Sequence, residues 1–149
     1  MTADRLALLF PALSSSGYEV TSLAAPEYNC ISWAAEDTGR WWEPVPLPLP
    51  SYYWPPGVPL ELTLASYVQA FESIGYRVCG DETLEADVEK IALYVSADGV
   101  PTHAARQLAS GEWTSKLGKS VDIRHRTLAA LEGDMYGRVA YLMGRPRST

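Results

Sequence analysis

The stretch Glu89-Lys90-Ile91-Ala92-Leu93-Tyr94-Val95 decides the fold, because it has the clearest strand character in the chain. Turn signals follow it at residues 98–99 and 110–111. Each turn leads into a further strand-like stretch, at residues 101–108 and 112–118. Strands joined by such short turns pair with their neighbours in antiparallel fashion. Residues 89–118 therefore predict a three-stranded antiparallel meander.

Helical patterns precede this meander. Residues 6–13 favour an N-terminal helix, and residues 62–74 favour an amphipathic helix that ends at Gly75. The apolar face of the second helix would comprise Leu64, Val68, Phe71 and Ile74. Short strands are expected at 18–23 and 76–79. Because helices come first and strands later, we expect an α+β fold with N-terminal helices packed on a C-terminal antiparallel sheet.

The end of the chain is less regular. Residues 121–125 and 127–131 predict a connection followed by a short helix or turn, and residues 136–143 predict a final strand or short helix. At 149 residues the chain fits one domain. Its expected parts are an N-terminal helix and approach segment (1–25), a cysteine helix (26–39), a proline and aromatic loop (40–60), a helix (61–75), and an antiparallel sheet with C-terminal elements (76–149).

The charge of the chain is acidic and unevenly distributed. Residues 1–100 carry 4 basic and 14 acidic side chains, whereas residues 101–149 carry 8 basic and 4 acidic ones. Nucleic-acid binding needs a basic surface, so a nucleic-acid partner is not expected. No apolar run is long enough to span a membrane, and the N-terminus lacks a convincing signal peptide. We therefore expect no membrane association and a cytoplasmic location.

The stretch Glu27-Tyr28-Asn29-Cys30-Ile31-Ser32-Trp33-Ala34-Ala35 places a cysteine where a helix is expected to begin, with Gly39 suited to cap its end. Free amide groups and the helix dipole at such a position favour the thiolate form. The alternative is that Cys30 is a small buried apolar residue. Cys79 lies on an expected strand without a nearby base and is interpreted as structural.

Residues 40–59 combine seven prolines with five large aromatic side chains. Proline lacks an amide donor and fixes φ, so this segment cannot form a regular helix or a central strand. Its aromatic area favours an ordered loop held against the body of the domain. This loop either walls a substrate groove or covers an apolar end of the domain.

The chain has only two cysteines and two histidines, which limits the candidates for nucleophilic catalysis. The best pair is Cys30 as nucleophile and His103 as base, because an imidazole can deprotonate a thiol at neutral pH. The candidates for the residue that orients the imidazole are Ser115, Asp122 and, third, His125. The candidate oxyanion and substrate-binding residues are Asn29, Trp33 and Trp113. The spacing supports no metal site and no cofactor.

A cysteine on a helix, followed by an antiparallel sheet that carries a histidine and then a polar residue, resembles the papain-like cysteine peptidases of the NlpC/P60 and CHAP type. The resemblance rests on Asn29-Cys30, on Trp33-Ala34 and on residues 90–95 and 102–105, and it covers residues 26–118. It implies a papain-like topology and a peptide or protein substrate. It also implies Cys30 as nucleophile and His103 as base, with Ser115 or Asp122 as the orienting residue. The chain also resembles uncharacterised small bacterial proteins, which would imply no known activity.

Two functions of different classes follow. The first is a cysteine hydrolase or transferase that attacks an amide through a thiolate at Cys30. The second is a non-catalytic acidic binding protein, of immunity or adaptor type, that contacts a protein partner through the aromatic segment 41–54. The reactivity of Cys30, and its dependence on His103, distinguishes them.

Overall fold

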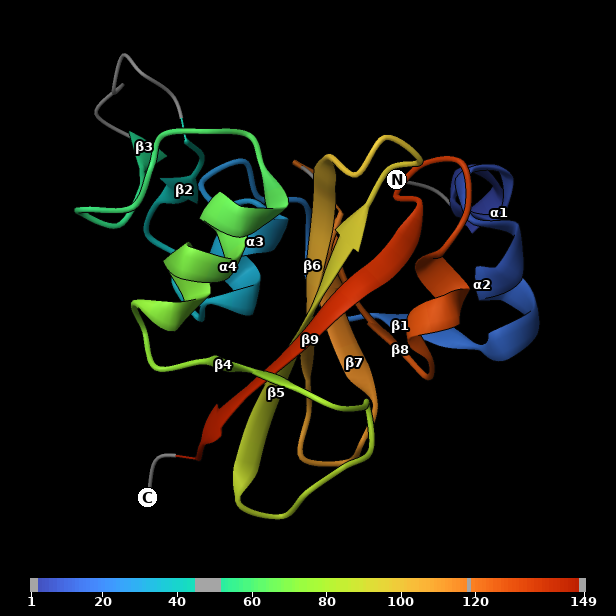
Figure 1. The fold of residues 1–149 in the computed structure, drawn as a ribbon. Coiled ribbons are helices and arrows are strands. Elements are labelled where there is room, and N and C mark those ends of the chain that lie inside the picture. Colours follow the sequence, from blue (N-terminus) through green and yellow to red (C-terminus); the bar gives the residue numbers. More distant parts are fainter. Residues whose placement is uncertain (1–2, 45–51, 118, 148–149) are drawn as a thin grey trace.

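The structure is a computed structural model that describes residues 3–44, 52–117 and 119–147. A seven-stranded sheet forms its centre, and helices cover both faces of that sheet (Figure 1). The prediction of an α+β fold built on an antiparallel sheet is confirmed at this level. None of the helices in the described residues is long and apolar enough to cross a membrane. Cys30 and Cys79 are both free.

All the strand pairs of the sheet are antiparallel, in the order β1-β8-β7-β6-β5-β9-β4. The strands are β1 (Tyr18–Val20), β4 (Arg77–Cys79), β5 (Val88–Val95), β6 (Pro101–Gln107), β7 (Trp113–Lys116), β8 (Asp122–His125) and β9 (Arg138–Pro146). The predicted meander is present as β5, β6 and β7. Its turns pass through Gly99 and Gly111, whose φ angles of 79° and 93° suit glycine.

Of two strands near the end of the chain, one differs from the expectation and the other decides between two expected alternatives. Residues 122–125, expected as a connection, form β8, and this strand joins β7 to the edge strand β1. The final element is a strand rather than a helix, and β9 lies inside the sheet between β5 and β4. The strand β9 thus links the edge strand β4 to the rest of the sheet.

The two faces of the sheet carry separate hydrophobic cores. Along β5, Ala92 and Tyr94 belong to one core and Ile91 and Leu93 to the other, as the alternation of side chains in a strand requires. The first core is covered by α1 (Ala3–Leu9), α2 (Pro11–Ser16) and the 3-10 helix η1 (Leu128–Leu131). The second is covered by α3 (Cys30–Ala34), α4 (Leu64–Glu72), β2 (Trp41–Trp42) and β3 (Tyr52–Tyr53). Figure 1 shows these groups on opposite sides of the sheet.

The N-terminal region forms two helices where one was expected. Pro11 occupies the first turn of α2, a position that needs no amide hydrogen and suits the fixed φ of proline. The chain therefore bends at Phe10, whose ring is buried in the first core. Leu6 and Leu13 fill the same core from the two helices.

The helix that begins at Cys30 is shorter than expected. It ends at Ala34, and Glu36 takes the left-handed conformation with φ of 63°, while the Asp37 amide donates to the Ser32 carbonyl. Glu36, and not Gly39, therefore reverses the chain after this helix. The expected apolar face of the helix at 62–74 does pack on the second core, with Phe71 fully buried and Leu64, Val68 and Ile74 partly buried against it. Ser66, Tyr67 and Ala70 of α4 are buried as well.

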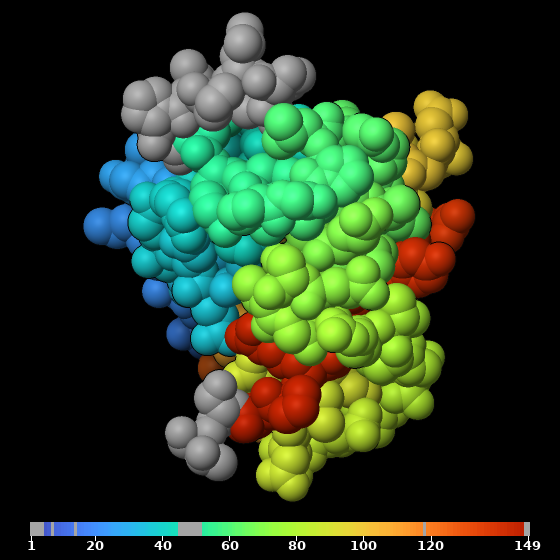
Figure 2. Space-filling model, turned by 60° about the vertical axis from the view of Figure 1, so that its left-hand side comes forward, coloured from blue at the N-terminus to red at the C-terminus, as the bar shows by residue number. Residues whose placement is uncertain are grey.

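The proline and aromatic segment is folded onto the second core where it is described. β2 and β3 pair in parallel, with Trp41 opposite Tyr52 and Trp42 opposite Tyr53. Residues 45–51 of the expected loop lie outside the described residues. Figure 2 shows residues 52–72 beside residues 30–44 on one face of the molecule.

Candidate functional site

Cys30 is the first residue of α3, as the sequence predicts. Asn29 caps this helix: its side chain accepts a hydrogen bond from the Ser32 amide at 3.0 Å, and the Ser32 hydroxyl accepts one from the Asn29 amide at 2.8 Å. This reciprocal pair satisfies amide groups at the helix start. The cap fixes the position of the Cys30 thiol relative to the sheet.

The Asn29 side chain also bonds to the strand that follows its helix. Its amide nitrogen donates to the Trp42 carbonyl at 2.8 Å, and its oxygen accepts from the Trp42 amide at 3.3 Å. Asn29 therefore joins α3 to β2. These contacts engage the side-chain oxygen and one of the two amide hydrogens, and the role of Asn29 as an oxyanion donor stays a prediction.

We expect Asn29→Ala to lower the free energy of unfolding by about 2 kcal/mol, because it removes a helix cap and two buried hydrogen bonds. Asn29→Asp is the comparison variant, since it keeps the capping oxygen but sets a carboxylate oxygen against the Trp42 carbonyl. It should recover at most the capping part of the loss, about 1 kcal/mol. Urea denaturation of the three proteins measures the difference. Equal stability of Asn29→Ala and the wild type would contradict the assignment.

Cys30 is partly exposed, but the surroundings of its thiol favour the protonated form. Burial raises the pKa of Cys30 to about 11, although the backbone amides of Ala104, Ile31 and Cys30 itself favour the thiolate. The nearby carboxylate of Glu43 raises the pKa further. The backbone amides at the helix start thus lower the pKa of the thiol, as expected, but desolvation raises it by more.

His103 lies on the opposite face of the sheet from Cys30. Ala104, which follows it on β6, belongs to the second core, against which Cys30 packs. The His103 ring instead stacks on Tyr136, with centroids 4.1 Å apart and planes 7° apart, and meets the edge of Tyr94 at 5.2 Å. These two tyrosines pack in the first core. The structure therefore does not assemble the expected Cys30–His103 pair.

The environment of His103 is apolar. Its side chain is fully buried, and neither ring nitrogen has a hydrogen-bond partner within the described part of the chain. Burial lowers its pKa well below the usual value, and the charge of His125 would lower it further. His103 is consequently neutral at physiological pH and poorly placed to accept a proton from a thiol.

Ser115 pairs with His125 and not with His103. The His125 Nδ1 lies 2.9 Å from the Thr127 carbonyl, so this nitrogen carries the proton and Nε2 accepts from the Ser115 hydroxyl at 2.8 Å. Ser115 and His125 are fully buried in the face covered by α1, α2 and η1, next to Trp113. This order of groups could activate a serine, but both side chains are shielded from solvent.

Asp122 and Trp33 lie on the face of Cys30. The Tyr28 hydroxyl donates to Asp122 Oδ2 at 2.9 Å, and Asp122 Oδ1 is buried without a hydrogen-bond partner among the described residues. Trp33 donates from Nε1 to the Thr114 hydroxyl at 3.0 Å and stacks on Tyr28 at 5.5 Å. Both expected site residues thus hold α3 and the segment before it against the sheet.

Lys116 is a residue of this region that the sequence analysis missed. Its ammonium group donates to the Ser120 carbonyl and lies 5.1 Å from the centre of the Tyr28 ring. Burial lowers its pKa, and Asp122 and Cys30 act in the opposite direction. The alternation along β7 could have indicated it, because Thr114 and Lys116 point to the same face. No group of three potential metal ligands occurs in the described residues.

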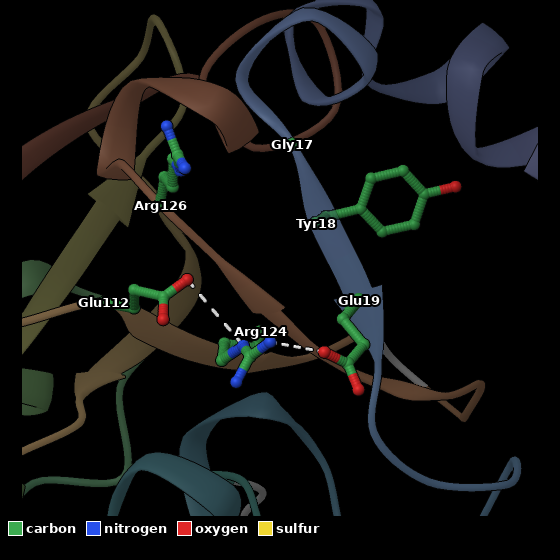
Figure 3. A pocket seen from close by; sticks show the side chains of 6 residues that line it. All are labelled: Gly17, Tyr18, Glu19, Glu112, Arg124 and Arg126. Carbon is green, nitrogen blue, oxygen red and sulfur yellow. Dashed lines mark hydrogen bonds and ion pairs between the residues drawn. The ribbon is translucent and has the colours of Figure 1, made fainter. Parts of the chain in front are cut away.

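A separate polar pocket of about 230 Å³ lies at the end of β1, lined by Gly17, Tyr18, Glu19, Glu112, Arg124 and Arg126 (Figure 3). Arg124 forms ion pairs with Glu19 and, at 3.7 Å, with Glu112. Its charge is therefore already balanced within the fold. The ion pair of Arg124 with Glu19 connects β8 to β1 at this pocket. None of the expected site residues lines the pocket.

Comparison with known proteins identifies a family but not an activity. Neither the curated proteins nor the solved structures gave a match. A family model described as a domain of unknown function, DUF7689, matches residues 19–144, which include every strand from β4 to β8 together with α3 and α4. The chain belongs to this DUF7689 family.

Proposed function

We propose that this protein is a non-catalytic binding protein that contacts a protein partner through its aromatic segment. The observation that carries the proposal is the separation of the candidate nucleophile from its base. Cys30 faces the second core with a raised pKa, and His103 is stacked on Tyr136 in the first core. A thiol without a base in hydrogen-bonding reach is a weak nucleophile at neutral pH.

The described part of the aromatic segment has the composition of a protein interface. Trp41 and Tyr52 stack at 6.3 Å, and the Arg40 guanidinium lies 3.6 Å from the centre of the Tyr53 ring. Arg40 is exposed, and the three aromatic side chains are partly exposed. Tryptophan, tyrosine and arginine dominate binding energy in interfaces. Here they are already ordered, which lowers the entropy lost on binding.

A papain-like cysteine hydrolase is the second candidate, and one observation favours it. Cys30 begins α3, and α3 packs against β6 and β7, the strands that carry His103 and Ser115. A papain-like topology is part of this second proposal. Catalysis would require the His103 ring to leave Tyr136 and Tyr94 and to reach the other face of the sheet.

Alkylation of Cys30 separates the two candidates. The binding proposal expects Cys30 to resist iodoacetamide at pH 8 and to react only as the pH approaches 11, because its thiol is desolvated. His103→Phe keeps the stacked ring and should leave this dependence unchanged. Peptide mass spectrometry measures Cys30 and Cys79 separately in each protein. Reaction of Cys30 well below pH 8, lost in His103→Phe, would support the hydrolase and overturn the proposal.

Partner capture tests the surface itself. Trp41→Ser combined with Tyr52→Ser should abolish capture of a partner from lysate, because it removes the stacked pair. Tyr141→Ser is the matched control, since Tyr141 is 43% exposed on β9 and lies outside the aromatic segment. A partner captured equally by all three proteins would count against the aromatic segment.

A further inference from the structure

A second pocket, of about 350 Å³, lies between η1, β9 and the chain that follows β4. Leu128, Val139 and Leu142 give it an apolar floor. The acidic residues that line it are Asp81, Glu82 and Glu132. Of the described residues that line this acidic pocket, none is basic. It is separate from Cys30 and from the aromatic segment.

The acidic edge of this pocket is held in place by Lys90. This side chain is 1% exposed, and its ammonium group donates to the carbonyls of Asp81 at 3.0 Å and Thr83 at 2.7 Å. It also forms an ion pair with Glu85 at 2.7 Å. Gln107 donates from its amide to the Glu82 carbonyl at 2.9 Å. The backbone of residues 81–85 is therefore ordered before any ligand arrives.

The negative charges at the pocket are only partly balanced within the fold. Glu132 accepts from the Val139 amide at 2.9 Å, a contact with a neutral group. Hydrogen bonds from Thr83 lower the pKa of Asp81, so that this carboxylate is charged at neutral pH. Among the described side chains, Glu82 forms no ion pair. The buried Lys90 lies 3.5 Å from Asp81 Oδ1 and offsets that charge, so the negative charge left at the pocket is that of Glu82 and Glu132.

An apolar floor with a negative edge suits a side chain that has an apolar stem and a cationic head. We propose that the acidic pocket binds an arginine or lysine side chain carried by a basic segment of a partner protein. The aliphatic stem covers Leu128 and Leu142, and the cationic head reaches Glu82 and Glu132. The net charge of −6 attracts such a segment from a distance.

The test uses the full chain and a fluorescein-labelled peptide of alternating arginine and leucine. Ala129 is exposed and lines the pocket, so Ala129→Trp fills the pocket without changing the core. We expect this variant to weaken binding at least about tenfold in fluorescence anisotropy. Glu82→Gln should weaken binding about threefold, as the loss of one exposed charge pair does. Glu61→Gln, at an exposed acid outside the pocket, is the matched control and should bind as the wild type does.

Two results would overturn the proposal. Unchanged binding by Ala129→Trp would show that the peptide lies elsewhere. Equal weakening by Glu61→Gln and Glu82→Gln would show attraction to the overall charge rather than to the pocket. Urea denaturation confirms that each variant is folded. Trp41→Ser combined with Tyr52→Ser should leave peptide binding unchanged, so this test is independent of the aromatic segment.

Discussion

We expect the protein to lose about 3 kcal/mol of stability between pH 7 and pH 5, because two histidines are buried in neutral form. His103 and His125 are both fully buried in the core covered by α1, α2 and η1. Burial lowers the pKa of His125 to about 4 and that of His103 well below its usual value. Urea denaturation at a series of pH values measures the loss.

The sign follows from the proton balance. The unfolded chain binds protons at both histidines near pH 6.5, whereas the folded protein does not do so until the pH approaches 4 at His125. Stability is therefore fully present above pH 6.5 and is lost as the pH falls from there towards the folded pKa. The pKa values of Asp37 and Asp81 are lowered, so these two carboxylates affect the stability only in more acidic solution.

His103→Phe isolates the contribution of one histidine. Phenylalanine keeps the ring against Tyr136 and removes two buried nitrogens without hydrogen-bond partners in the described part of the chain. We expect this variant to be at least as stable as the wild type at pH 7, because an unpaired buried polar group destabilises a core. Its loss between pH 7 and pH 5 should be about half that of the wild type. A wild type with equal stability at pH 7 and pH 5 would contradict the prediction.

The same histidine shows where sequence reasoning stops. The strand that carries His103 was predicted correctly, but its facing direction was not. Ile91, Ala92, Leu93 and Tyr94 are all buried on the neighbouring strand, so the sequence contains no polar alternation that would mark the two faces. A shift of one residue moves a side chain to the other face of a sheet. The choice between His103 and Ala104 as the neighbour of Cys30 is made by the packing of α3.

Cys30 shows a second limit. Its place at a helix start was predicted from local pattern, and the Asn29 cap confirms it. Desolvation depends on what covers the helix, and that information lies in residues far along the chain, such as Ala104. The strand β9 was ambiguous for a similar reason, because an apolar run such as residues 139–143 suits either a buried strand or a helix. Its partners β5 and β4 decide the outcome.

Gly137→Ala should destabilise the protein strongly, with a loss of about 4 kcal/mol in the free energy of unfolding. Gly137 has a φ of 76°, and a Cβ atom there would lie 1.9 Å from the Val95 carbonyl oxygen. Because that oxygen belongs to the backbone of β5, it cannot move aside without separating β5 from β9. The change would also displace Tyr136, which stacks on His103 and packs against Phe10.

Gly99→Ala separates the two causes of this loss. Gly99 has nearly the same φ, 79°, but a Cβ atom there meets nothing within 4 Å. It should therefore lose only the cost of the left-handed conformation, about 1 kcal/mol. Urea denaturation of both variants gives the difference, which measures the collision with β5 alone. Similar losses in the two variants would mean that the close approach of Gly137 to Val95 adds nothing to the loss, and would contradict the prediction. A much larger loss in Gly137→Ala would establish this contact as the point where the last strand is fixed within the sheet.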